Sequence, residues 1–264
     1  MSYLCWKSDR PLIAIDCETS HWDKASEFFA VTQIGAIASN GWMIMATMDP
    51  GEEILSRMQP DVVGLTGLTP AVIRREDAGT GALDELTAQL SAGEPAVIVA
   101  HNWPFDRHAL NAECDRRGIR FDFSKLDFVD TYRVVQELYD EGIWEPGGSR
   151  LPNMKLATCF YGIVPERHWD SLPAGRSHTA LYDASMSLMV MRAILEMGTT
   201  IEDLISISRQ PFIPRTCPMG KDKGKAWADV DAGFLSWMAQ KRVWGDNEGL
   251  ELAVLTEMER RGML

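Results

Sequence analysis

Two acidic residues follow the first apolar segment of the sequence, in the stretch LIAIDCETSH at residues 12–21. The four apolar residues are short and partly β-branched, which predicts a buried strand. Side chains two positions apart on a strand point to the same face, so Asp16 and Glu18 would lie side by side and repel each other. Such a pair needs a cation, a proton or solvent nearby. Taken alone, it is more typical of a solvated strand end, and the same spacing recurs at Asp246 and Glu248.

Two further clusters of polar residues stand at the ends of apolar segments. The segment AVIVA is followed by His101 and Asn102 and then by Asp106, and near the start of a long helical segment His178 and Asp183 lie five positions apart. Each cluster by itself is also compatible with an ordinary helix start, where an acid lies near the positive end of the helix dipole. The H-x-x-x-x-D spacing is a weak signal alone, because His101 and Asp106 share it.

Together the three clusters supply four carboxylates and an imidazole: Asp16, Glu18, Asp106, Asp183 and His178. Hard oxygen ligands in this number suit Mg²⁺ or Mn²⁺. Two such ions about 3.5–4 Å apart can stabilise both the attacking and the leaving oxygen when a phosphodiester is displaced. The attacking water then needs a base. Imidazole titrates near neutral pH, which favours His178 for that role.

Alternating strands and helices must position these groups. The apolar patterns predict a first strand that starts at residue 12 and ends on Asp16 and Glu18, and further strands at residues 31–39, 42–48, 96–100 and 128–131. Asn40-Gly41 predicts a hairpin between the second and the third of these strands. Helical spacing covers residues 81–93, 105–118, 132–140, 153–162 and 178–198. Three prolines within residues 208–218 predict a linker, so we expect one domain at 1–205 and a second, with two helices, at 206–264.

The ordered series D-x-E, H-N-x-x-F-D and H-x-x-x-x-D resembles the DEDDh (DnaQ-like) 3′–5′ exonucleases over residues 11–197. The segments GLTP, VDTYR and NMKLATCFYGI are similar to the Gly-Ile-Thr, Asp-Thr and Lys-Leu-rich segments of that family. The resemblance implies an α/β, ribonuclease H-like mixed sheet flanked by helices. It implies two metal ions on the four carboxylates and His178 as general base. It also implies substrate contacts at Thr19, Ser20, His101, Asn102 and Phe105.

The loop after the first motif departs from the family. The family often continues D-x-E-T with Ser or Thr and then glycine, whereas this chain has Ser20, His21 and Trp22. Backbone groups of this stretch contact the terminal nucleotide in the family, so the choice between DNA and RNA stays open here. Trp22 could stack on a base, although a packed tryptophan is the favoured interpretation.

The C-terminal residues 206–264 resemble the small, mainly helical C-terminal domain of exodeoxyribonuclease X and similar enzymes. The matching pattern is Gly-Lys-x-x-Gly-Lys followed by an aromatic-Leu-x-Trp helix. Lysines on a glycine-bearing turn could bind phosphates, and an equally good interpretation is a solvated turn. Phe234 and Trp237 are expected in the core of this domain. The lysines concerned are Lys221, Lys223 and Lys225.

Charge and cysteine usage limit the possible partners and compartment. The net charge of −12 lowers the expectation of a nucleic-acid partner. The first 206 residues carry 17 basic and 30 acidic side chains, and the remainder carries 9 and 8, so the acidity lies in the body, where bound cations would offset part of it. The five scattered cysteines are typical of reduced thiols in the cytoplasm. Neither a signal peptide nor a membrane span is expected.

The sequence therefore predicts a metal-dependent 3′–5′ exonuclease that acts on DNA with a free 3′ end and releases nucleoside monophosphates. One alternative is an exoribonuclease of the same family. A second alternative, from another class, is a non-catalytic nucleic-acid-binding or interaction module with a degenerate metal site. The presence of all five key residues disfavours that second alternative.

Overall fold

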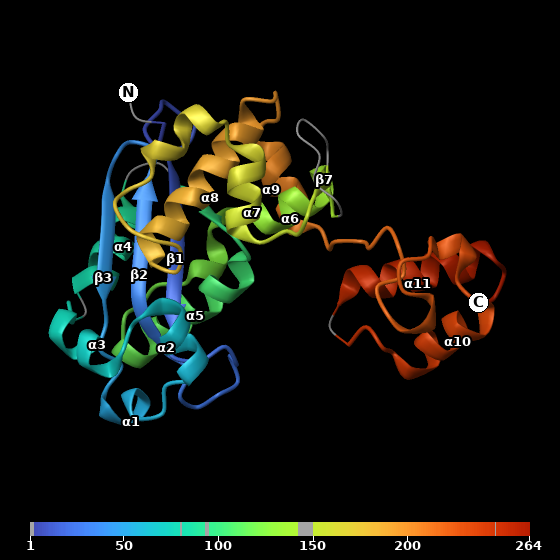
Figure 1. The fold of residues 1–264 in the computed structure, drawn as a ribbon, viewed down its shortest axis with the longest axis horizontal. Coiled ribbons are helices and arrows are strands. Elements are labelled where there is room, and N and C mark those ends of the chain that lie inside the picture. The colour runs from blue at the N-terminus through green and yellow to red at the C-terminus, as the bar shows by residue number, and fades with distance from the viewer. Residues whose placement is uncertain (1–2, 80, 93–94, 142–149, 246) are drawn as a thin grey trace. The chain divides into compact units, whose positions relative to one another are not determined.

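The computed structural model describes residues 3–79, 81–92, 95–141, 150–245 and 247–264. The chain divides into two compact units, Met1–Ser208 and Arg209–Leu264 (Figure 1). Asp246, half of the second D-x-E match, lies outside the described residues, and Glu248 begins a helix. Each unit has its own hydrophobic core, so each is described by itself.

The first unit is built on a mixed five-stranded sheet in the order β3-β2-β1-β4-β5. Strands β1, β2 and β3 pair antiparallel, while β1, β4 and β5 pair parallel. This arrangement confirms the predicted ribonuclease H-like sheet. The strand bounds are β1 Leu12–Thr19, β2 Val31–Ala38, β3 Met43–Thr47, β4 Val97–Ala100 and β5 Asp127–Asp130.

The first acidic pair lies in the last part of β1, as expected from the prediction that this strand ends on Asp16 and Glu18. The strand continues to Thr19 because β2 pairs with it along its length, with Asp16 opposite Gly35 and Glu18 opposite Gln33. Ladder hydrogen bonds from β2 therefore hold the backbone that carries both acids.

Helices cover both faces of the sheet, and the alternation along β1 decides which face carries the acids. Leu12 and Ala14 belong to the core shared with α6, α7 and α8, whereas Ile13 and Ile15 belong to the core shared with α4 and α5. The even-numbered side chains of β1 thus face α8. Figure 1 shows that α8 lies across this face of the sheet. Helix bounds are α1 Glu52–Leu55, α2 Pro60–Thr66, α3 Pro70–Glu76, α4 Gly81–Ser91, α5 Trp103–Arg117, α6 Thr131–Leu138, α7 Leu156–Ile163, α8 Ala180–Leu195 and α9 Ile201–Arg209.

A glycine allows α8 to begin directly on the sheet. A Cβ atom on Gly35 would lie 2.0 Å from the backbone nitrogen of Leu181 and 2.1 Å from the carbonyl carbon of Ala180. The side chain of Gln33 fixes the same helix start, since its Oε1 accepts a hydrogen bond from the Ala180 N–H at 3.0 Å. The first turn of α8 is therefore held over the part of β1 that carries the acids.

The second unit consists of α10 (Ala232–Lys241), α11 (Glu248–Arg260) and the segment before them. Its core contains Cys217, Leu235, Met238 and Val254 together with other apolar residues of the same unit. The mainly helical character is as predicted. The expectation that Trp237 lies in this core is wrong, because its side chain is 45% exposed. Its ring stacks on Phe234 instead, with the centroids 5.4 Å apart and the planes at 11°.

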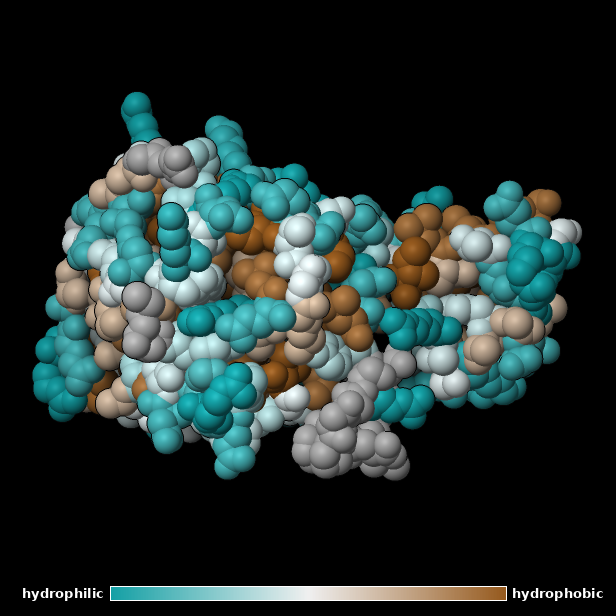
Figure 2. All heavy atoms as spheres, turned by 90° about the horizontal axis from the view of Figure 1, so that it is seen from above, coloured by the Kyte–Doolittle hydropathy of each residue, from teal (hydrophilic) through white to brown (hydrophobic). Residues whose placement is uncertain are grey.

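The surface is mostly hydrophilic, and the cysteines are unpaired. Figure 2 shows hydrophilic residues over much of the visible face of each unit, interrupted by smaller hydrophobic patches. The five cysteines are free and form no disulfide. Among the described residues, no helix combines the length and the apolar character that crossing a membrane requires.

Candidate active site

The four carboxylates of the sequence motifs come from three elements that meet at one end of β1. Asp16 and Glu18 lie on β1, Asp106 in the first turn of α5, and Asp183 in the first turn of α8. Glu18, Asp106 and Asp183 are buried and Asp16 is half-buried. His178 lies two residues before α8. The structure thus brings together five residues that span more than half of the sequence.

Backbone hydrogen bonds fix the orientation of two of these carboxylates. The N–H of Cys17, between the two acids of β1, donates to Oδ1 of Asp106 at 2.9 Å and so joins α5 to β1. The N–H of His178 donates to Oδ2 of Asp183 at 3.1 Å. Glu18, His178 and Asp183 each offer one atom that could ligate a metal ion, and these three atoms all lie within 4.8 Å of one another.

Burial and mutual repulsion make the ionised cluster unfavourable. Burial raises the pKa of Asp16 well above its usual range, and the charges of Asp106, Glu18 and Asp183 raise it further. Burial, followed by the charge of Asp183, raises the pKa of Glu18 to about 7. Burial also raises the pKa of Asp183 to about 6, although the hydrogen bond from the His178 N–H lowers it. The cluster therefore requires protons or a cation.

The donor set fits a hard divalent cation. The four carboxylates offer only oxygen atoms, which Mg²⁺ and Mn²⁺ prefer. Within the described part of the chain, Oδ1 of Asp183 is buried without a hydrogen-bond partner, as expected of an oxygen atom that binds a metal ion. No thiolate competes, because burial and the neighbouring acids raise the pKa of Cys17 well above its usual value.

His178 combines accessibility with a neutral ring. Its backbone is in the left-handed region, with φ at 66°, and its side chain is 45% exposed. The ring nitrogen Nδ1 lies 3.9 Å from Oδ2 of Asp183. Partial burial, and then the charge of Arg176, lowers the pKa of His178. The imidazole is therefore mostly neutral at pH 7 and able to accept a proton.

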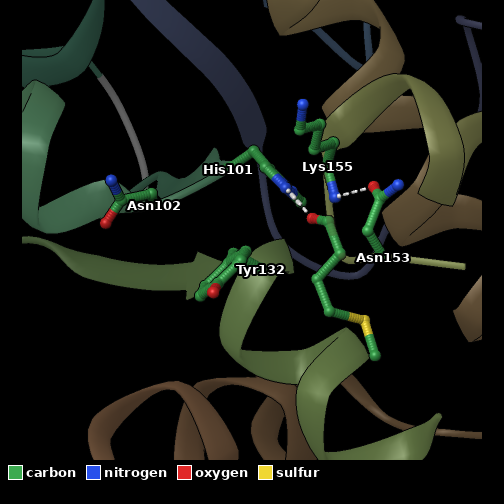
Figure 3. A pocket seen from close by; sticks show the side chains of 6 residues that line it. His101, Asn102, Tyr132, Asn153 and Lys155 are labelled. Carbon is green, nitrogen blue, oxygen red and sulfur yellow. Dashed lines mark hydrogen bonds between the residues drawn. The ribbon is translucent and has the colours of Figure 1, made fainter. Parts of the chain in front are cut away.

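His101, which shares the H-x-x-x-x-D spacing, is committed to structural contacts. Its Nδ1 lies 3.0 Å from Oγ1 of Thr131, and its Nε2 lies 2.8 Å from the carbonyl oxygen of Met154 (Figure 3). Burial lowers the pKa of His101 to about 4. Because both ring nitrogens are occupied, His101 holds the segment before α7 against β4 and is a poor candidate for the base.

The predicted substrate residues of the first motif are engaged inside the protein. The hydroxyl of Thr19 donates to the carbonyl oxygen of His21 at 2.8 Å. The hydroxyl of Ser20 donates to the carbonyl oxygen of Phe28 at 2.6 Å and accepts from the N–H of Ala30 at 2.9 Å. Both side chains are buried, so they stabilise the shape of the loop and are not exposed to a substrate.

The predicted substrate residues of the second motif have different surroundings. Phe105 packs edge-on against Phe29, with ring centroids 5.8 Å apart. Asn102 is exposed and caps α5 in the left-handed region, with φ at 76°. Its N–H donates to Oδ1 of Asp130 at 2.9 Å. Of these residues, Asn102 has the side chain best placed to meet a ligand.

Trp22 in the departing loop is not packed, contrary to the favoured interpretation. Its side chain is 47% exposed, and its indole N–H donates to Oδ2 of Asp61 at 2.9 Å. The backbone N–H of Trp22 donates to Oε1 of Gln59 at 2.9 Å. These two bonds hold the ring at the surface of the loop, next to α2.

Sequence reasoning did not single out three residues that organise the site. Gly35 and Gln33 set the position of α8, and the alternating apolar pattern of β2 gave no sign of this contact. Arg176 donates from Nη2 to the carbonyl oxygen of Thr66 at 2.9 Å and so anchors the loop that carries His178. Its only sequence signal is its place two residues before the histidine.

The three lysines of the second unit differ in their partners. Lys221 pairs with Asp231 at 3.0 Å, and Lys225 pairs with the buried Asp222 at 2.5 Å. Lys223 is exposed and forms no salt bridge with any residue that the structure describes. Lys225 therefore has a structural role, while Lys223 is the one most accessible to a phosphate.

Comparison with known proteins identifies a distant relative by sequence. No family model matches the chain. Exodeoxyribonuclease 10 of Escherichia coli K12 is 26% identical over 144 residues, which are 53% of this chain and 55% of that protein. The match thus spans about half the length of the curated relative.

Solved structures show the same fold. E. coli exonuclease I in complex with a dA16 oligonucleotide has a TM-score of 0.55 at 20% identity, over 75% of this chain and 42% of that chain. Exonuclease X in complex with 5′ overhanging duplex DNA has a TM-score of 0.50 at 16% identity, over 75% and 99%. A zinc-bound form of E. coli exonuclease I with single-stranded DNA scores 0.53 at 18% identity, over 73% and 41%.

These findings confirm the resemblance that the motifs indicated. At such identities the structural likeness establishes the shared fold, and the sequence match to exodeoxyribonuclease 10 adds a common origin. The chain is a distant homologue of exodeoxyribonuclease 10 and has the fold of exonucleases I and X.

Proposed function

We propose that this protein is a metal-dependent 3′–5′ exonuclease that hydrolyses the last phosphodiester bond at a DNA 3′ end and releases nucleoside monophosphates. The observation that carries the proposal is the convergence of four carboxylates with raised pKa values beside a neutral, accessible imidazole. Distant homology to exodeoxyribonuclease 10 supports an exonuclease, and solved structures of the same fold in complex with DNA support that substrate.

The four carboxylates would hold two Mg²⁺ or Mn²⁺ ions. When bound, such ions supply Lewis-acid stabilisation of the charge that develops on the phosphate oxygens. The protein contributes the rigid placement of the ligands: β2 holds the backbone of Asp16 and Glu18, the Cys17 N–H orients Asp106, and the His178 N–H orients Asp183.

His178 would act as the general base. Its side chain is accessible to water, and its lowered pKa leaves the ring ready to take the proton of the attacking water. The anchor from Arg176 to Thr66 keeps the loop in place while the proton moves. The proposal also places the enzyme in the cytoplasm, where free thiols such as those of this chain stay reduced.

Residues 206–264 would form a separate domain that helps hold the substrate without taking part in the chemistry. The carboxylates and the histidine of the site all belong to the first unit. Lys223 is the best candidate for a phosphate contact in the second unit, since its two neighbouring lysines are paired with acids.

A substrate panel tests the proposal. Single-stranded DNA, duplex DNA and RNA, each labelled at the 3′ end, are incubated with the protein and Mg²⁺, Mn²⁺ or excess EDTA. We expect labelled mononucleotide from DNA with either ion and none with EDTA. Faster release from RNA would favour the exoribonuclease, and binding without release under every condition would favour the non-catalytic module.

A further inference from the structure

Two aromatic rings lie against each other at the surface of the second unit. Phe234 and Trp237 stand three positions apart on α10, and their rings form an aromatic stack with the centroids 5.4 Å apart and the planes at 11°. Phe234 also packs against the core of this unit, whereas Trp237 is 45% exposed. The outer ring of the stack is therefore open to solvent, while the inner ring joins it to the core.

A tight turn supports the aromatic stack from below. A Cβ atom on Gly220 would lie 2.4 Å from Cζ of Phe234, so only glycine lets the turn approach the ring this closely. Asp231 caps α10 by accepting a hydrogen bond from the Phe234 N–H at 2.9 Å. The charge of Asp231 is offset by Lys221 at 3.0 Å. Because Phe234 is fixed in this way, the ring of Trp237 is held in a defined plane.

The indole N–H of Trp237 is free to bind a ligand. It donates no hydrogen bond to any residue that the structure describes. By contrast, the indole N–H groups of Trp22, Trp42, Trp169 and Trp227 each donate to an oxygen atom of the protein. Tryptophan usually satisfies this group when it serves a structural role. Trp237 thus offers a flat ring and a hydrogen-bond donor together.

Positive charges without acidic partners accompany the aromatic stack. Helix α10 carries no acidic residue, and Lys241 stands one turn after Trp237 on it. The turn that touches Phe234 through Gly220 also carries Lys223. Both lysines are exposed, and within the described ranges of the chain neither forms a salt bridge. Free cations beside an aromatic ring suit the phosphates that flank a stacked base.

We propose that the aromatic stack of α10 is a binding site for an unpaired nucleobase. The base lies on the exposed ring of Trp237, and Lys223 and Lys241 contact neighbouring phosphates. The proposal rests on the function proposed above and deepens it, because it names the feature by which the second unit holds nucleic acid at a nucleotide that is not hydrolysed. The free lysines and the lack of acids on α10 favour a polyanion over a protein as the occupant.

Photocrosslinking tests the contact in the unaltered full-length protein. Single strands of about 20 nucleotides, each with one 5-iododeoxyuridine at a different position, are irradiated with the protein in excess EDTA. We expect a covalent adduct on Trp237, located by mass spectrometry of the digested protein, because halogenated uracils react with aromatic rings on which they stack. Adducts confined to residues outside α10 would overturn the proposal.

Binding affinity tests the ring itself. Fluorescence anisotropy with a labelled single strand in EDTA compares the wild type with Trp237→Ala, Trp237→Leu and Trp237→Phe. We expect Trp237→Ala and Trp237→Leu to weaken binding at least about fivefold, the lower end for one lost base stack. Trp237→Phe keeps an aromatic ring and should stay within about threefold of the wild type. Leu252→Ala is the matched control, because Leu252 lies on α11 and is 44% exposed.

Two further measurements separate the base from the phosphates. Lys241→Ala should lower the slope of log affinity against log salt by about 0.7, as for one lost phosphate contact on a single strand. Blunt-ended duplex DNA, whose bases already stack on one another, should bind the wild type and Trp237→Ala equally. A loss of duplex binding in Trp237→Ala as large as that of single-strand binding would contradict a base stack.

The remaining outcomes decide between this proposal and its alternatives. Equal losses in Trp237→Ala and Leu252→Ala would assign the effect to folding of the second unit and overturn the proposal. Normal affinity in Trp237→Ala and Trp237→Leu would leave the aromatic stack as a docking face for a protein. If binding depends on Trp237 but the wild type hydrolyses no nucleic acid, the proposed function fails and the base site stands.

Discussion

Single residues of the acidic cluster oppose folding when no cation is present. The pKa of Glu18 is raised to about 7, above its usual 4.5, so the folded chain holds this proton more tightly than the unfolded chain. Stability therefore falls as pH rises between those two values and levels off above them. We predict that Glu18→Gln stabilises the metal-free protein at pH 8. The free energy of unfolding should rise by up to about 3 kcal/mol, and the Tm should rise with it.

The same measurement reports on the metal. Addition of Mg²⁺ should raise the Tm of the wild type at pH 8 far more than at pH 5, where protons compete for the carboxylates. Glu18→Gln should lose most of that gain, and Glu27→Gln, at an exposed position, should keep it. A wild-type Tm that is indifferent to both pH and Mg²⁺ would contradict the account of the cluster.

The imidazole of His178 is predicted to serve turnover and not binding. We expect His178→Ala to lower kcat by about 10²–10⁴-fold, the usual contribution of a positioned base. KM for single-stranded DNA should change little, and the acidic limb of the pH–rate profile should be altered. His108→Ala, at an exposed position on α5, is the control. Near-normal turnover in His178→Ala would remove this residue from the mechanism.

At the residue scale the sequence predicted the acids because three clusters, each a weak signal alone, occur in the order of a known series of motifs. The H-x-x-x-x-D spacing alone could not rank His178 above His101, because both histidines have it, and the family resemblance was what favoured His178. The difference lies in contacts across the fold: His101 reaches Thr131 and Met154, 30 and 53 residues away. Likewise, the hydroxyl of Ser20 is occupied by Phe28 and Ala30 across a loop whose shape no local pattern encodes.

At the scale of elements, the contact between β2 and α8 positions the site. Because a Cβ on Gly35 would meet backbone atoms of α8 at 2.0–2.5 Å, we predict that Gly35→Ala displaces the first turn of that helix. Overpacking of this kind costs about 1–3 kcal/mol. Asp183 and His178 move with the helix, so kcat should fall together with the Tm.

A second glycine provides the matched control for that prediction. Gly64 lies in α2 with nothing within 4 Å of a built Cβ, and alanine is the better helix former by about 0.5–1 kcal/mol. Gly64→Ala should therefore leave activity unchanged and raise the Tm slightly. If Gly35→Ala behaves like Gly64→Ala, the close approach of α8 to β2 does not hold the site together.

The sheet and its long helices followed from sequence periodicity, because each buries one face against a neighbour. The short helices α1, α2 and α3 were not predicted, since four to seven residues carry too little periodicity. The burial of Glu18 on β1 did not follow from the strand pattern alone. Two charges on a strand argue against burial locally, and only pairing with β2 and a site for cations reverse that expectation.

At the scale of the whole molecule, the second unit has a core of its own, built from residues of that unit. Lys223→Ala should weaken single-stranded DNA binding and lower its salt slope by about 0.7 log units, while turnover at saturating DNA barely changes. Lys225→Ala should instead lower the Tm, because it leaves the buried Asp222 without its ion pair. If DNA binding and its salt dependence are unchanged in Lys223→Ala, Lys223 lies on a solvated turn and does not contact a phosphate.

The central claim is that Asp16, Glu18, Asp106 and Asp183 hold the divalent cation that hydrolysis requires. The most direct test measures the shortening of a 5′-labelled single-stranded oligonucleotide in the presence of Mg²⁺ by the wild type and by Asp183→Asn. Asparagine has nearly the same shape as aspartate, so we expect this variant to keep the fold. We predict stepwise shortening from the 3′ end with release of nucleoside monophosphates by the wild type, and a loss of at least about 10³-fold in Asp183→Asn. Undiminished shortening by Asp183→Asn, or by the wild type in excess EDTA, would contradict the account.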